Sequence, residues 1–475
     1  MAYAATELKE PAGAVIPPAD EPPVAPKCQS VRTISVVGLG YTGARTLATF
    51  ARQGFQVIGA DSSSQIVDAL RFGHSPVFAP GLADLVKDGV QSGRISATNT
   101  LLSAVASSDL TVLCDSPTSR SDDGFDLGNL LEAARQIGEA LRSKKQFHVV
   151  ALRCIVPPGS TSGAFTSALE RASGKTAGVD FGIAFYPDFN PHGVSPAAPQ
   201  RDRPIIVGVS DARTLEILES IIETGKAGLH VTTVEVAEMA QHADRLRQAT
   251  CALLANEVGR LCRSMNIDGS EVLKLSNCKM PALGEQRRPA AGIALGHSQL
   301  ARDAGMLSRL AGSKGLSLPL IDSLVPSNQF QIDGALELLK PFAGQRIGVL
   351  GITVDPTTDD IRQSPMIDLM AAIIERGDDV WFYDPNLRCG SKLRNEVGFL
   401  HKSAPKLSPV LDRLEQMAVS SASMLAKLCD VLVVAHATDE FRSVVENRPR
   451  RVAVIDLVRL FEKVPDDPRY HGLFW

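Results

Sequence analysis

The feature that most constrains the fold is a glycine-rich turn set between an expected strand and an expected helix. A β-branched run at 33–37 leads directly into Gly38-Leu39-Gly40-Tyr41-Thr42-Gly43, and an amphipathic stretch follows at 44–52. Glycines here allow a tight turn and let a pyrophosphate approach the backbone N–H groups at a helix N-terminus, where the helix dipole favours anions. The context predicts a dinucleotide-binding turn. The alternative is a glycine turn that only packs the helix against its strand.

Asp61 supports the dinucleotide interpretation. It ends the next expected strand, about twenty residues after the turn, where an acidic residue typically accepts hydrogen bonds from the ribose hydroxyls. A carboxylate at that place also repels a 2′-phosphate. The expected cofactor is therefore NAD rather than NADP.

Two series of short apolar, β-branched runs continue this pattern, each alternating with amphipathic stretches as in a parallel α/β sheet. The first series lies at 33–38, 56–61, 110–114, 148–153, 181–186 and 205–209, and the second at 346–351, 380–383, 431–435 and 452–456. Between them, a stretch from about Val234 to Met265 carries apolar residues at helical spacing, with no glycine before Gly259. The expected order is α/β, helical spacer, α/β.

The length of 475 residues is too great for one hydrophobic core. We expect a proline-rich disordered tail at 1–30 and a NAD-binding Rossmann domain at 31–222. A central helical domain at 223–325 and a Rossmann-like C-terminal domain at 326–475 complete the expected division.

Composition excludes several classes of protein. The net charge of −4 provides no basic excess for a nucleic acid backbone. No apolar run approaches the roughly 20 residues of a membrane helix, and the first thirty residues lack the pattern of a signal peptide, so a cytoplasmic location is expected. The eight cysteines include no CxxC pair, which predicts reduced thiols and no metal site.

Further motifs run through the chain from about Val31 to the last residue: Gly59-Ala60-Asp61, Ser75-Pro76, Pro80-Gly81-Leu82, Ser92-Gly93-Arg94, Val156-Pro157-Pro158-Gly159-Ser160-Thr161, Asn256-Glu257-Val258-Gly259 and Thr358-Asp359-Asp360-Ile361-Arg362-Gln363-Ser364-Pro365. With these motifs, the chain resembles the UDP-glucose and GDP-mannose dehydrogenase family. The C-terminal Tyr470-His471-Gly472-Leu473-Phe474-Trp475 is similar to the GDP-mannose branch in particular.

The resemblance implies a fold class and a set of ligands. The expected fold is α/β, with two Rossmann-like doubly wound parallel-sheet domains joined by a long central helix and a helical dimerisation domain. NAD is expected on the N-terminal domain, contacted by Leu39, Tyr41, Thr42, Ser116 and Arg362 in addition to the glycines and Asp61. A nucleotide sugar is expected towards the C-terminal domain, and the partner is a second copy of the chain.

The family reaction oxidises the C6 alcohol of the sugar twice, to an acid, with two NAD. A cysteine traps the intermediate aldehyde, so that a second hydride leaves and a thioester forms, which water then hydrolyses. A lysine and an asparagine stabilise the developing oxyanions, and acidic residues handle protons and water.

The nucleophile is absent from its expected position. The family's Gly-Gly-Ser-Cys-Leu-Pro-Lys-Asp matches Gly296-His297-Ser298-Gln299-Leu300-Ala301-Arg302-Asp303. The carboxamide of Gln299 cannot attack an aldehyde, so the thioester route is closed at this position. Cys278, about twenty residues upstream, is interpreted as a packed thiol rather than a substitute nucleophile.

Other family positions are also changed. The lysine of Ala-Glu-Met-x-Lys falls on Gln241, and the later asparagine falls on Arg245. The glutamate of Pro-Glu-Phe is the shorter Asp188. Three further changes are Asp115-Ser116-Pro117 for Gly-Thr-Pro, Cys154 for a hydroxyl residue, and Val354-Asp355 for a Phe-Lys whose ammonium contacts the nucleotide sugar.

Four residues remain as candidates for proton handling. His297 lies two residues before the lost nucleophile and His242 adjoins the lost lysine, so either is a candidate general base near neutral pH. The alternative for His297 is an ordinary polar loop residue. Asp303 and Asp188 are candidates for retained roles with water or protons, although an Asp at a helix start is commonly an N-cap.

Three function classes follow from these substitutions. The first is an NAD-dependent oxidoreductase on a nucleotide sugar with altered chemistry. The second is a catalytically inactive homologue that regulates or scaffolds an active partner. The third is the product of a duplicated gene under relaxed selection, which folds and binds NAD but has no further role.

Overall fold

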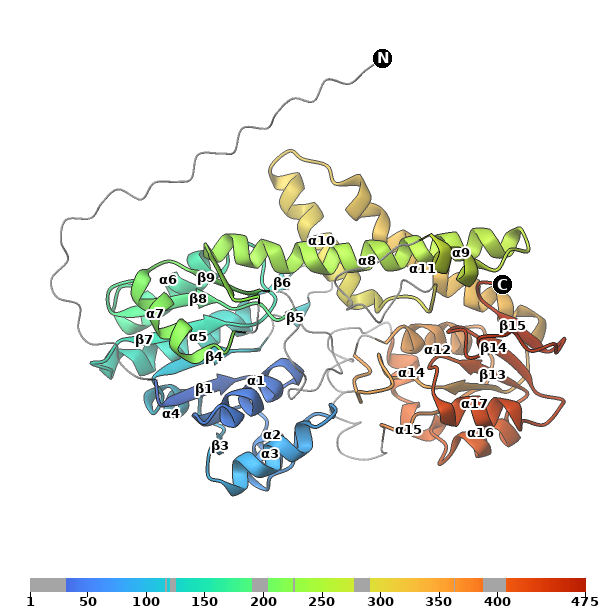
Figure 1. The fold of residues 1–475 in the computed structure, drawn as a ribbon, viewed down its shortest axis with the longest axis horizontal. Helices are drawn as coiled ribbons and strands as arrows, with labels where there is room; N and C mark the ends of the chain where they lie inside the picture. The colour runs from blue at the N-terminus through green and yellow to red at the C-terminus, as the bar shows by residue number, and fades with distance from the viewer. Residues whose placement is uncertain are drawn as a thin grey trace, which may run out of the picture.

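The computed structural model describes residues 31–115, 118–119, 125–189, 204–224, 227–276, 291–362, 364–387 and 407–475. Two α/β bodies lie side by side, and the long helix α8 (Val234–Ser264) runs across both of them (Figure 1). The two bodies and the helix between them confirm the α/β, helical spacer, α/β order expected from the sequence.

The N-terminal body is built on an eight-stranded sheet with the order β10-β9-β8-β7-β4-β1-β2-β3. Its strands are β1 (Thr33–Val37), β2 (Gln56–Ala60), β3 (Ile95–Thr98), β4 (Leu110–Leu113), β7 (His148–Leu152), β8 (Phe181–Phe185), β9 (Ile205–Val209) and β10 (Leu229–Thr232). The six strands expected from the sequence are present, whereas β3 and β10 were not expected. A short antiparallel pair, β5 (Thr118–Ser119) and β6 (Phe125–Asp126), lies outside this sheet.

One pairing departs from the parallel arrangement expected from the sequence. Strand β9 runs antiparallel to β8, and β10 runs parallel to β9. A buried apolar run looks the same whichever way the strand points, because the connection between strands sets the direction. The remaining pairings of this sheet are parallel.

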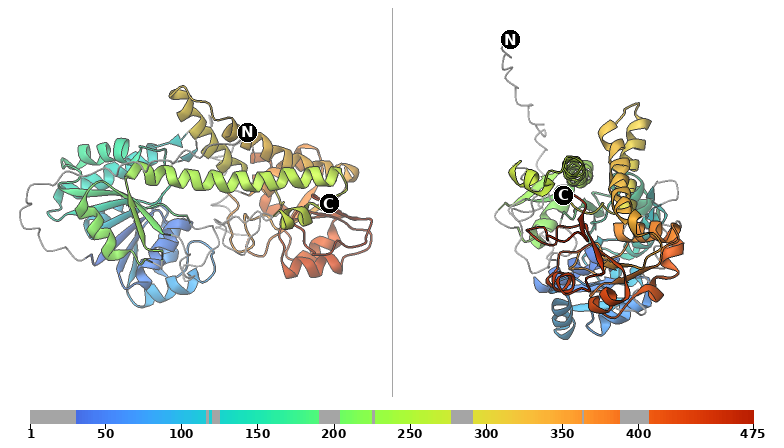
Figure 2. Two further views of the ribbon diagram at one scale, coloured as in Figure 1. Left: turned by 45° about the horizontal axis from the view of Figure 1, so that its top comes forward. Right: turned by 90° about the vertical axis from the view of Figure 1, so that its right-hand side faces the viewer.

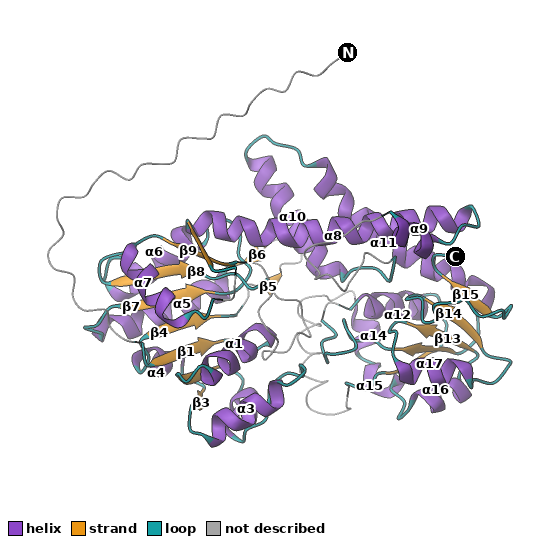
Figure 3. Ribbon diagram, in the orientation of Figure 1, coloured by secondary structure: helices purple, strands orange, loops and turns teal. Residues whose placement is uncertain are grey.

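Helices cover both faces of this sheet, as Figure 3 shows. One core packs α1, α3 and α7 against one face, and a second packs α4, α5, α6 and the start of α8 against the other. The helices are α1 (Tyr41–Arg52), α2 (Ser64–Arg71), α3 (Leu82–Gln91), α4 (Leu101–Ala106), α5 (Gly128–Ser143), α6 (Thr166–Ser173) and α7 (Ala212–Ile221), with a π-helical turn η1 at Thr161–Phe165. Burial on both faces explains why the strands read as nearly continuous apolar runs.

The helix α8 begins where the sequence predicts. The Thr233 hydroxyl accepts a hydrogen bond from the Val236 N–H, which caps the first turn, and Met265 is the C-cap. Three further helices, α9 (Gly269–Leu275), α10 (His297–Ser313) and α11 (Pro319–Leu339), complete the helical part. Apolar residues of α8, α10 and α11 form one core, and the α10–α11 hairpin projects beyond α8 in both views of Figure 2. The domain boundary expected between residues 325 and 326 lies inside α11.

The C-terminal body holds a parallel five-stranded sheet with the order β12-β11-β13-β14-β15. Its strands are β11 (Ile347–Leu350), β12 (Val380–Tyr383), β13 (Val431–Val434), β14 (Ala453–Asp456) and β15 (Tyr470–Gly472); the helices are η3 (Lys340–Phe342), α12 (Pro365–Glu375), α14 (Ser408–Leu411), α15 (Leu414–Met417), α16 (Ala422–Leu428) and α17 (Asp439–Glu446). The end of the chain returns to the helical part, where the Gly269 N–H donates a hydrogen bond to the Phe474 carbonyl at 3.2 Å.

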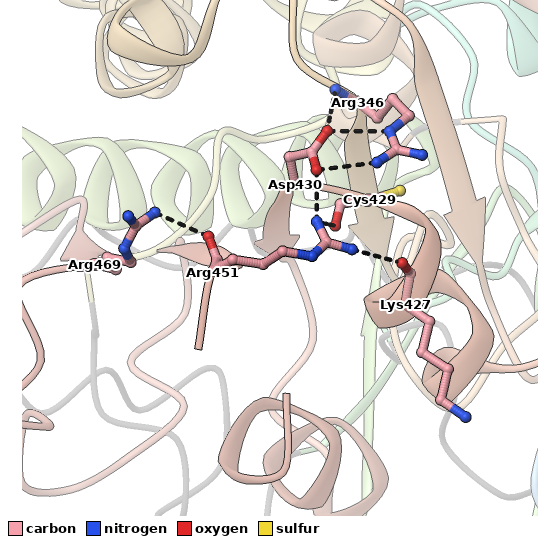
Figure 4. Close-up of polar contacts among 6 residues, drawn as sticks. All are labelled: Arg346, Lys427, Cys429, Asp430, Arg451 and Arg469. Atoms are coloured by element: carbon pink, nitrogen blue, oxygen red, sulfur yellow. Dashed lines mark hydrogen bonds and ion pairs between the residues drawn. The ribbon is translucent and has the colours of Figure 1, made fainter. Parts of the chain in front are cut away.

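An arginine network fixes the amino edge of this second sheet (Figure 4). Arg346 donates two hydrogen bonds to Asp430 at 3.0 and 3.1 Å, and Arg451 donates a third at 2.6 Å. Arg469 extends the network to the Arg451 carbonyl at 2.9 Å. These residues precede β11, β13, β14 and β15, so the network aligns the strand starts and leaves the carboxyl edge of the sheet for a ligand.

Within the described ranges, no helix is both long enough and apolar enough to cross a membrane.

Candidate functional site

The glycine turn joins the end of β1 to the start of α1. Gly38 has a φ of +82°, a conformation that a residue with a Cβ rarely adopts. Its N–H donates to the Ala60 carbonyl at 2.9 Å, and a Cβ added here would lie 2.8 Å from Cβ of Asp115. Gly38 is therefore required by the turn itself.

The other two glycines of the turn have different roles, one in packing and one beside open space. A Cβ on Gly43 would lie 1.8 Å from the Gly38 carbonyl oxygen, so Gly43 lets α1 pack against the turn. A Cβ on Gly40 would meet no described atom within 4 Å. Open space beside the helix N-terminus, where the N–H groups of Tyr41 and Thr42 begin the helix, suits a pyrophosphate. A turn that served packing alone has no need of a glycine at position 40.

Asp61 lies where the sequence predicts, directly after β2. Its two oxygens accept hydrogen bonds from the backbone N–H groups of Leu39 at 2.8 Å and Ser63 at 2.9 Å. These bonds hold the half-buried carboxylate beside the turn, and each oxygen keeps a lone pair for a ribose hydroxyl. The turn and Asp61 together fit NAD: the backbone at 39–43 would hold its phosphates, and Asp61 its adenosine ribose.

The C-terminal body contacts this turn directly. The Tyr41 hydroxyl donates a hydrogen bond to Asp359, and the Phe78 N–H donates to the same carboxylate oxygen at 3.2 Å. The guanidinium of Arg362 lies 5.4 Å from the centre of the Tyr41 ring and forms a bidentate pair with Asp360 at 3.0 and 3.1 Å. The structure thus brings Arg362 to the cofactor turn from more than 300 residues away in sequence.

Shortly after β8, Asp188 lies between two arginines. Arg45 of α1 contacts one oxygen of Asp188 at 2.5 Å, and Arg153, directly after β7, contacts the other at 3.4 Å. All three side chains are about nine-tenths buried. The side chain of Gln241 donates to the Asp188 carbonyl at 3.5 Å, which joins this group to α8.

Neither arginine was selected from the sequence. Arg45 stands inside the buried stretch of α1, and Arg153 ends a run of buried residues. A charged residue inside an apolar run was the available signal, because such a residue requires a partner in the fold. The Arg153 guanidinium also stacks on the Tyr186 ring, 4.0 Å from its centre.

Asp303 has a similar environment on α10. Arg245 of α8 donates to one of its oxygens at 2.7 Å, and Arg302 contacts the other at 3.4 Å. Burial alone favours the neutral acid, but the two guanidinium groups outweigh it and lower the pKa of Asp303 below its usual value. Asp303 is the seventh residue of its helix, so it is not an N-cap.

His242 and Glu238 lie on the face of α8 that covers the loop after β7. Nε2 of His242 lies 2.8 Å from the Val156 carbonyl, an acceptor, so this nitrogen carries the hydrogen. Burial lowers the pKa of His242, which keeps the ring neutral. Glu238 accepts hydrogen bonds from the N–H groups of Gly159 at 2.5 Å and Thr161 at 2.9 Å, so it anchors that loop.

The thiols near the carboxyl edge of the first sheet are poor nucleophiles. Cys114 and Cys154 follow β4 and β7, and both are buried. Burial raises the pKa of Cys114 to about 12 and that of Cys154 well above its usual value. Both thiols therefore stay protonated near neutral pH, whereas efficient attack on an aldehyde requires a thiolate.

Several predicted residues lie beyond the described part of the chain. Ser116 and Cys278 fall outside it, as do the side chains of His297 and Gln299. The backbone places Gly296 at the N-cap of α10, so His297 and Gln299 belong to the first helical turn rather than to a loop. Asp355 lies after β11 and accepts the Thr357 N–H at 2.9 Å.

These features define a class of protein. A strand–turn–helix that fits a dinucleotide, an acid at the end of the next strand, and a second parallel α/β body docked on that turn are the parts of a two-domain NAD-binding protein.

Comparison with known proteins defines the family. Residues 32–225 match the NAD binding domain of the UDP-glucose/GDP-mannose dehydrogenase family, residues 235–330 its central domain, and residues 348–463 its UDP binding domain. The chain belongs to the UDP-glucose/GDP-mannose dehydrogenase family. NAD is the cofactor of its N-terminal body.

Individual relatives agree with this assignment. The chain is 31% identical over 446 residues to the GDP-mannose 6-dehydrogenase of Pseudomonas putida, which covers 93% of this chain and 100% of the relative. It is 32% identical to that of Pseudomonas aeruginosa over 431 residues, or 90% of this chain and 96% of the relative. A solved UDP-glucose dehydrogenase from Pyrobaculum islandicum superposes with a TM-score of 0.80 at 26% identity, covering 95% of this chain and 100% of the other.

Proposed function

We propose that the protein is an NAD-dependent oxidoreductase that acts on a nucleotide sugar and transfers one hydride per sugar, without a thioester. The observations that carry the proposal are the glutamine at position 299, where the resemblance to the family places the nucleophile, and the raised pKa of two described thiols. The NAD turn and Asp61 nevertheless keep the geometry that a dinucleotide requires.

A single oxidation needs neither a thiol nor water. An alcohol C–H bond gives its hydride to bound NAD, the O–H bond gives its proton to a base, and a carbonyl group remains. His297 is the candidate base, because an imidazole accepts a proton near neutral pH and this residue lies in the first turn of α10, two residues before position 299. Asp303 is less suited to this role, since its two arginines lower its pKa and therefore its basicity.

We further propose that the protein works as a cytoplasmic homodimer whose interface lies along α8. Large apolar side chains are exposed on one side of this helix at helical spacing, namely Leu254, Leu261 and Met265, exposed by 56%, 61% and 60%. An apolar stripe of this kind favours an interface over contact with water.

The second candidate function is a catalytically inactive homologue that regulates or scaffolds an active one. It is supported by the state of the two retained acids, because Asp188 and Asp303 are each held between two arginines. A carboxylate in such a pair is stabilised in its ionised form and is a weak proton acceptor.

Counting hydrides separates these functions. The purified chain is given NAD and a panel of nucleotide sugars, NADH is measured at 340 nm, and the sugar consumed is measured in the same sample. One hydride per sugar supports the proposed oxidation. Two per sugar would overturn it, because an unrecognised nucleophile would then be present. No hydride, with NAD binding shown by calorimetry, supports the inactive homologue, and co-purification with an active dehydrogenase would identify its partner.

A further inference from the structure

We propose that three buried amide side chains position the start of α10, and with it the candidate base of the proposed reaction. They belong to Asn256, Asn328 and Gln331, and they hold the backbone of residues 292–295, which leads directly into α10. The role in catalysis rests on the proposed function, whereas the hold on the backbone does not.

The held segment has an unusual place in the fold. Residues 291–296 belong to no helix or strand, although Ala291 and Ala294 are buried there. The backbone N–H and C=O groups of this stretch therefore gain no partners from regular secondary structure. A buried backbone group without a partner is unfavourable, so the segment needs side chains that both donate and accept hydrogen bonds.

Two of these side chains come from α11. The Asn328 oxygen accepts a hydrogen bond from the Leu295 N–H at 2.7 Å, and the Asn328 nitrogen donates to the Leu295 carbonyl at 2.8 Å. Gln331, three residues later on the same face of the helix, donates to the Gly292 carbonyl at 2.5 Å. One helix therefore holds both ends of the segment.

The third side chain, Asn256, comes from α8. Its oxygen accepts a hydrogen bond from the Gly292 N–H at 2.8 Å, and its nitrogen donates to the Ile293 carbonyl at 3.4 Å. Three residues later on α8, Gly259 lets the segment approach the helix, because a Cβ added there would lie 2.8 Å from Cβ of Ala291. The first and last residues of this sequence motif thus bind the segment and make room for it.

The three amides are buried and fully used. The exposed fractions of Asn256, Asn328 and Gln331 are 2%, 0% and 1%. The Gln331 oxygen accepts a hydrogen bond from Arg260 at 2.8 Å, so both polar atoms of each amide have a partner. Replacing one of them with an apolar side chain would leave buried backbone groups without partners, which is costlier than losing a bond that water can replace.

The bonds to Leu295 bear on α10 because that helix begins two residues later. Its N-cap, Gly296, has no side chain with which to cap the first turn. Apolar packing against α8 and α11 holds the body of α10, but apolar contacts have no preferred direction. The directed hydrogen bonds of Asn328 therefore set where along the chain the helix starts, and so place its first turn, which includes His297.

Hydrogen exchange of the full-length protein, read by mass spectrometry of its peptides, tests the hold on the backbone. Asn328→Leu keeps the size of the side chain but removes both bonds to Leu295. Exchange should become at least about tenfold faster at residues 292–295 and in the first turn of α10. Val445→Ala, in a separate core of the C-terminal body, is the control: it should lower stability and leave exchange in these peptides unchanged. Unchanged exchange in Asn328→Leu, or faster exchange confined to residues 292–295, would overturn the proposal.

Asn328→Asp is the conservative variant. A neutral carboxyl group accepts the Leu295 N–H with one oxygen and donates to the Leu295 carbonyl with its O–H, as the amide does, whereas an ionised one only accepts. After correction for the intrinsic exchange rate, residues 292–295 of this variant should be better protected at about pH 5 than at about pH 8, and Asn328→Leu should show no such difference. Equal protection at both pH values would contradict the double hydrogen bond on which the proposal depends.

Steady-state kinetics with NAD and a nucleotide sugar tests the role in catalysis. In Asn328→Leu the kcat of NADH formation should fall at least about tenfold, because a small displacement of a reacting group is costly, while the KM for NAD stays within about twofold. Val445→Ala should keep the wild-type kcat. A wild-type kcat in Asn328→Leu would overturn the role in catalysis. A wild-type protein that forms no NADH would instead remove the proposed function, and hydrogen exchange alone would then decide the hold on α10.

Discussion

The hydroxyl of Tyr41, the first residue of the cofactor helix, donates a hydrogen bond to Asp359 of the C-terminal body. Both side chains are buried, and the same carboxylate also accepts the Phe78 N–H. One residue of the dinucleotide turn therefore takes part in holding the two α/β bodies together, which couples the contact between the bodies to the cofactor site.

Tyr41→Phe should weaken this coupling. Loss of the hydroxyl leaves a buried carboxylate with one partner fewer, and we expect unfolding to become easier by about 1–3 kcal/mol, with NAD bound several-fold more weakly. Denaturant unfolding and calorimetry with NAD measure the two effects. Tyr383→Phe is the matched control, because the Tyr383 hydroxyl contacts Glu440 within the C-terminal body, and its NAD affinity should not change. Unaltered stability and affinity in Tyr41→Phe would show that the contact carries no coupling.

Gly40→Ala should separate binding from folding. A Cβ at this position meets no described atom within 4 Å, so stability should stay within about 0.5 kcal/mol of the wild type. The same methyl group would fill the space beside the helix N-terminus and should weaken NAD binding at least about tenfold. Gly163→Ala, also in open space but away from the turn, is the control and should bind NAD normally. Normal NAD binding by Gly40→Ala would place the phosphates elsewhere.

Gln299→Cys should not restore the double oxidation. In this variant position 241 still holds glutamine in place of the expected lysine, and Asp303, four residues after the new thiol, is held by Arg245 and Arg302. We expect the variant to react with iodoacetamide at position 299, seen by peptide mass spectrometry, while NADH per sugar stays at one or below. The double variant Gln299→Cys, Gln241→Lys tests the lysine separately. Two hydrides per sugar from the single variant would show that the rest of the family machinery is intact.

His148 should make stability depend on pH. Burial in β7 lowers the pKa of His148 from 6.5 to about 3, so the folded chain keeps the ring neutral where the unfolded chain protonates it. Between these two pKa values the unfolded state therefore binds more protons than the folded state. The contribution of His148 to the free energy of unfolding is fully present above pH 6.5 and falls as the pH drops towards 3, by on the order of 1 kcal/mol per pH unit. Denaturant unfolding between pH 7 and 4 should show a smaller slope for His148→Gln. His74→Gln, at an exposed position, should leave the slope as in the wild type.

The fold was largely predictable from local pattern. The runs that became β1, β2, β4, β7 and β8 and the helical stretch that became α8 were recognised because each buries apolar residues at a regular spacing. Strand β3 was missed because only the first of its four residues is buried. The direction of β9 was missed because spacing carries no information on direction.

The cofactor turn was determined by the sequence itself, since Gly38 to Gly43 and Asp61 act through backbone geometry that neighbouring residues fix. The groups of arginines around Asp188 and Asp303 were decided by the tertiary structure. Arg45 and Asp188 are 143 residues apart, and Arg245 and Asp303 are 58 apart. Their charges could be read from the sequence, but their partners could not, because an ion pair depends on which strand ends and helices the fold brings together.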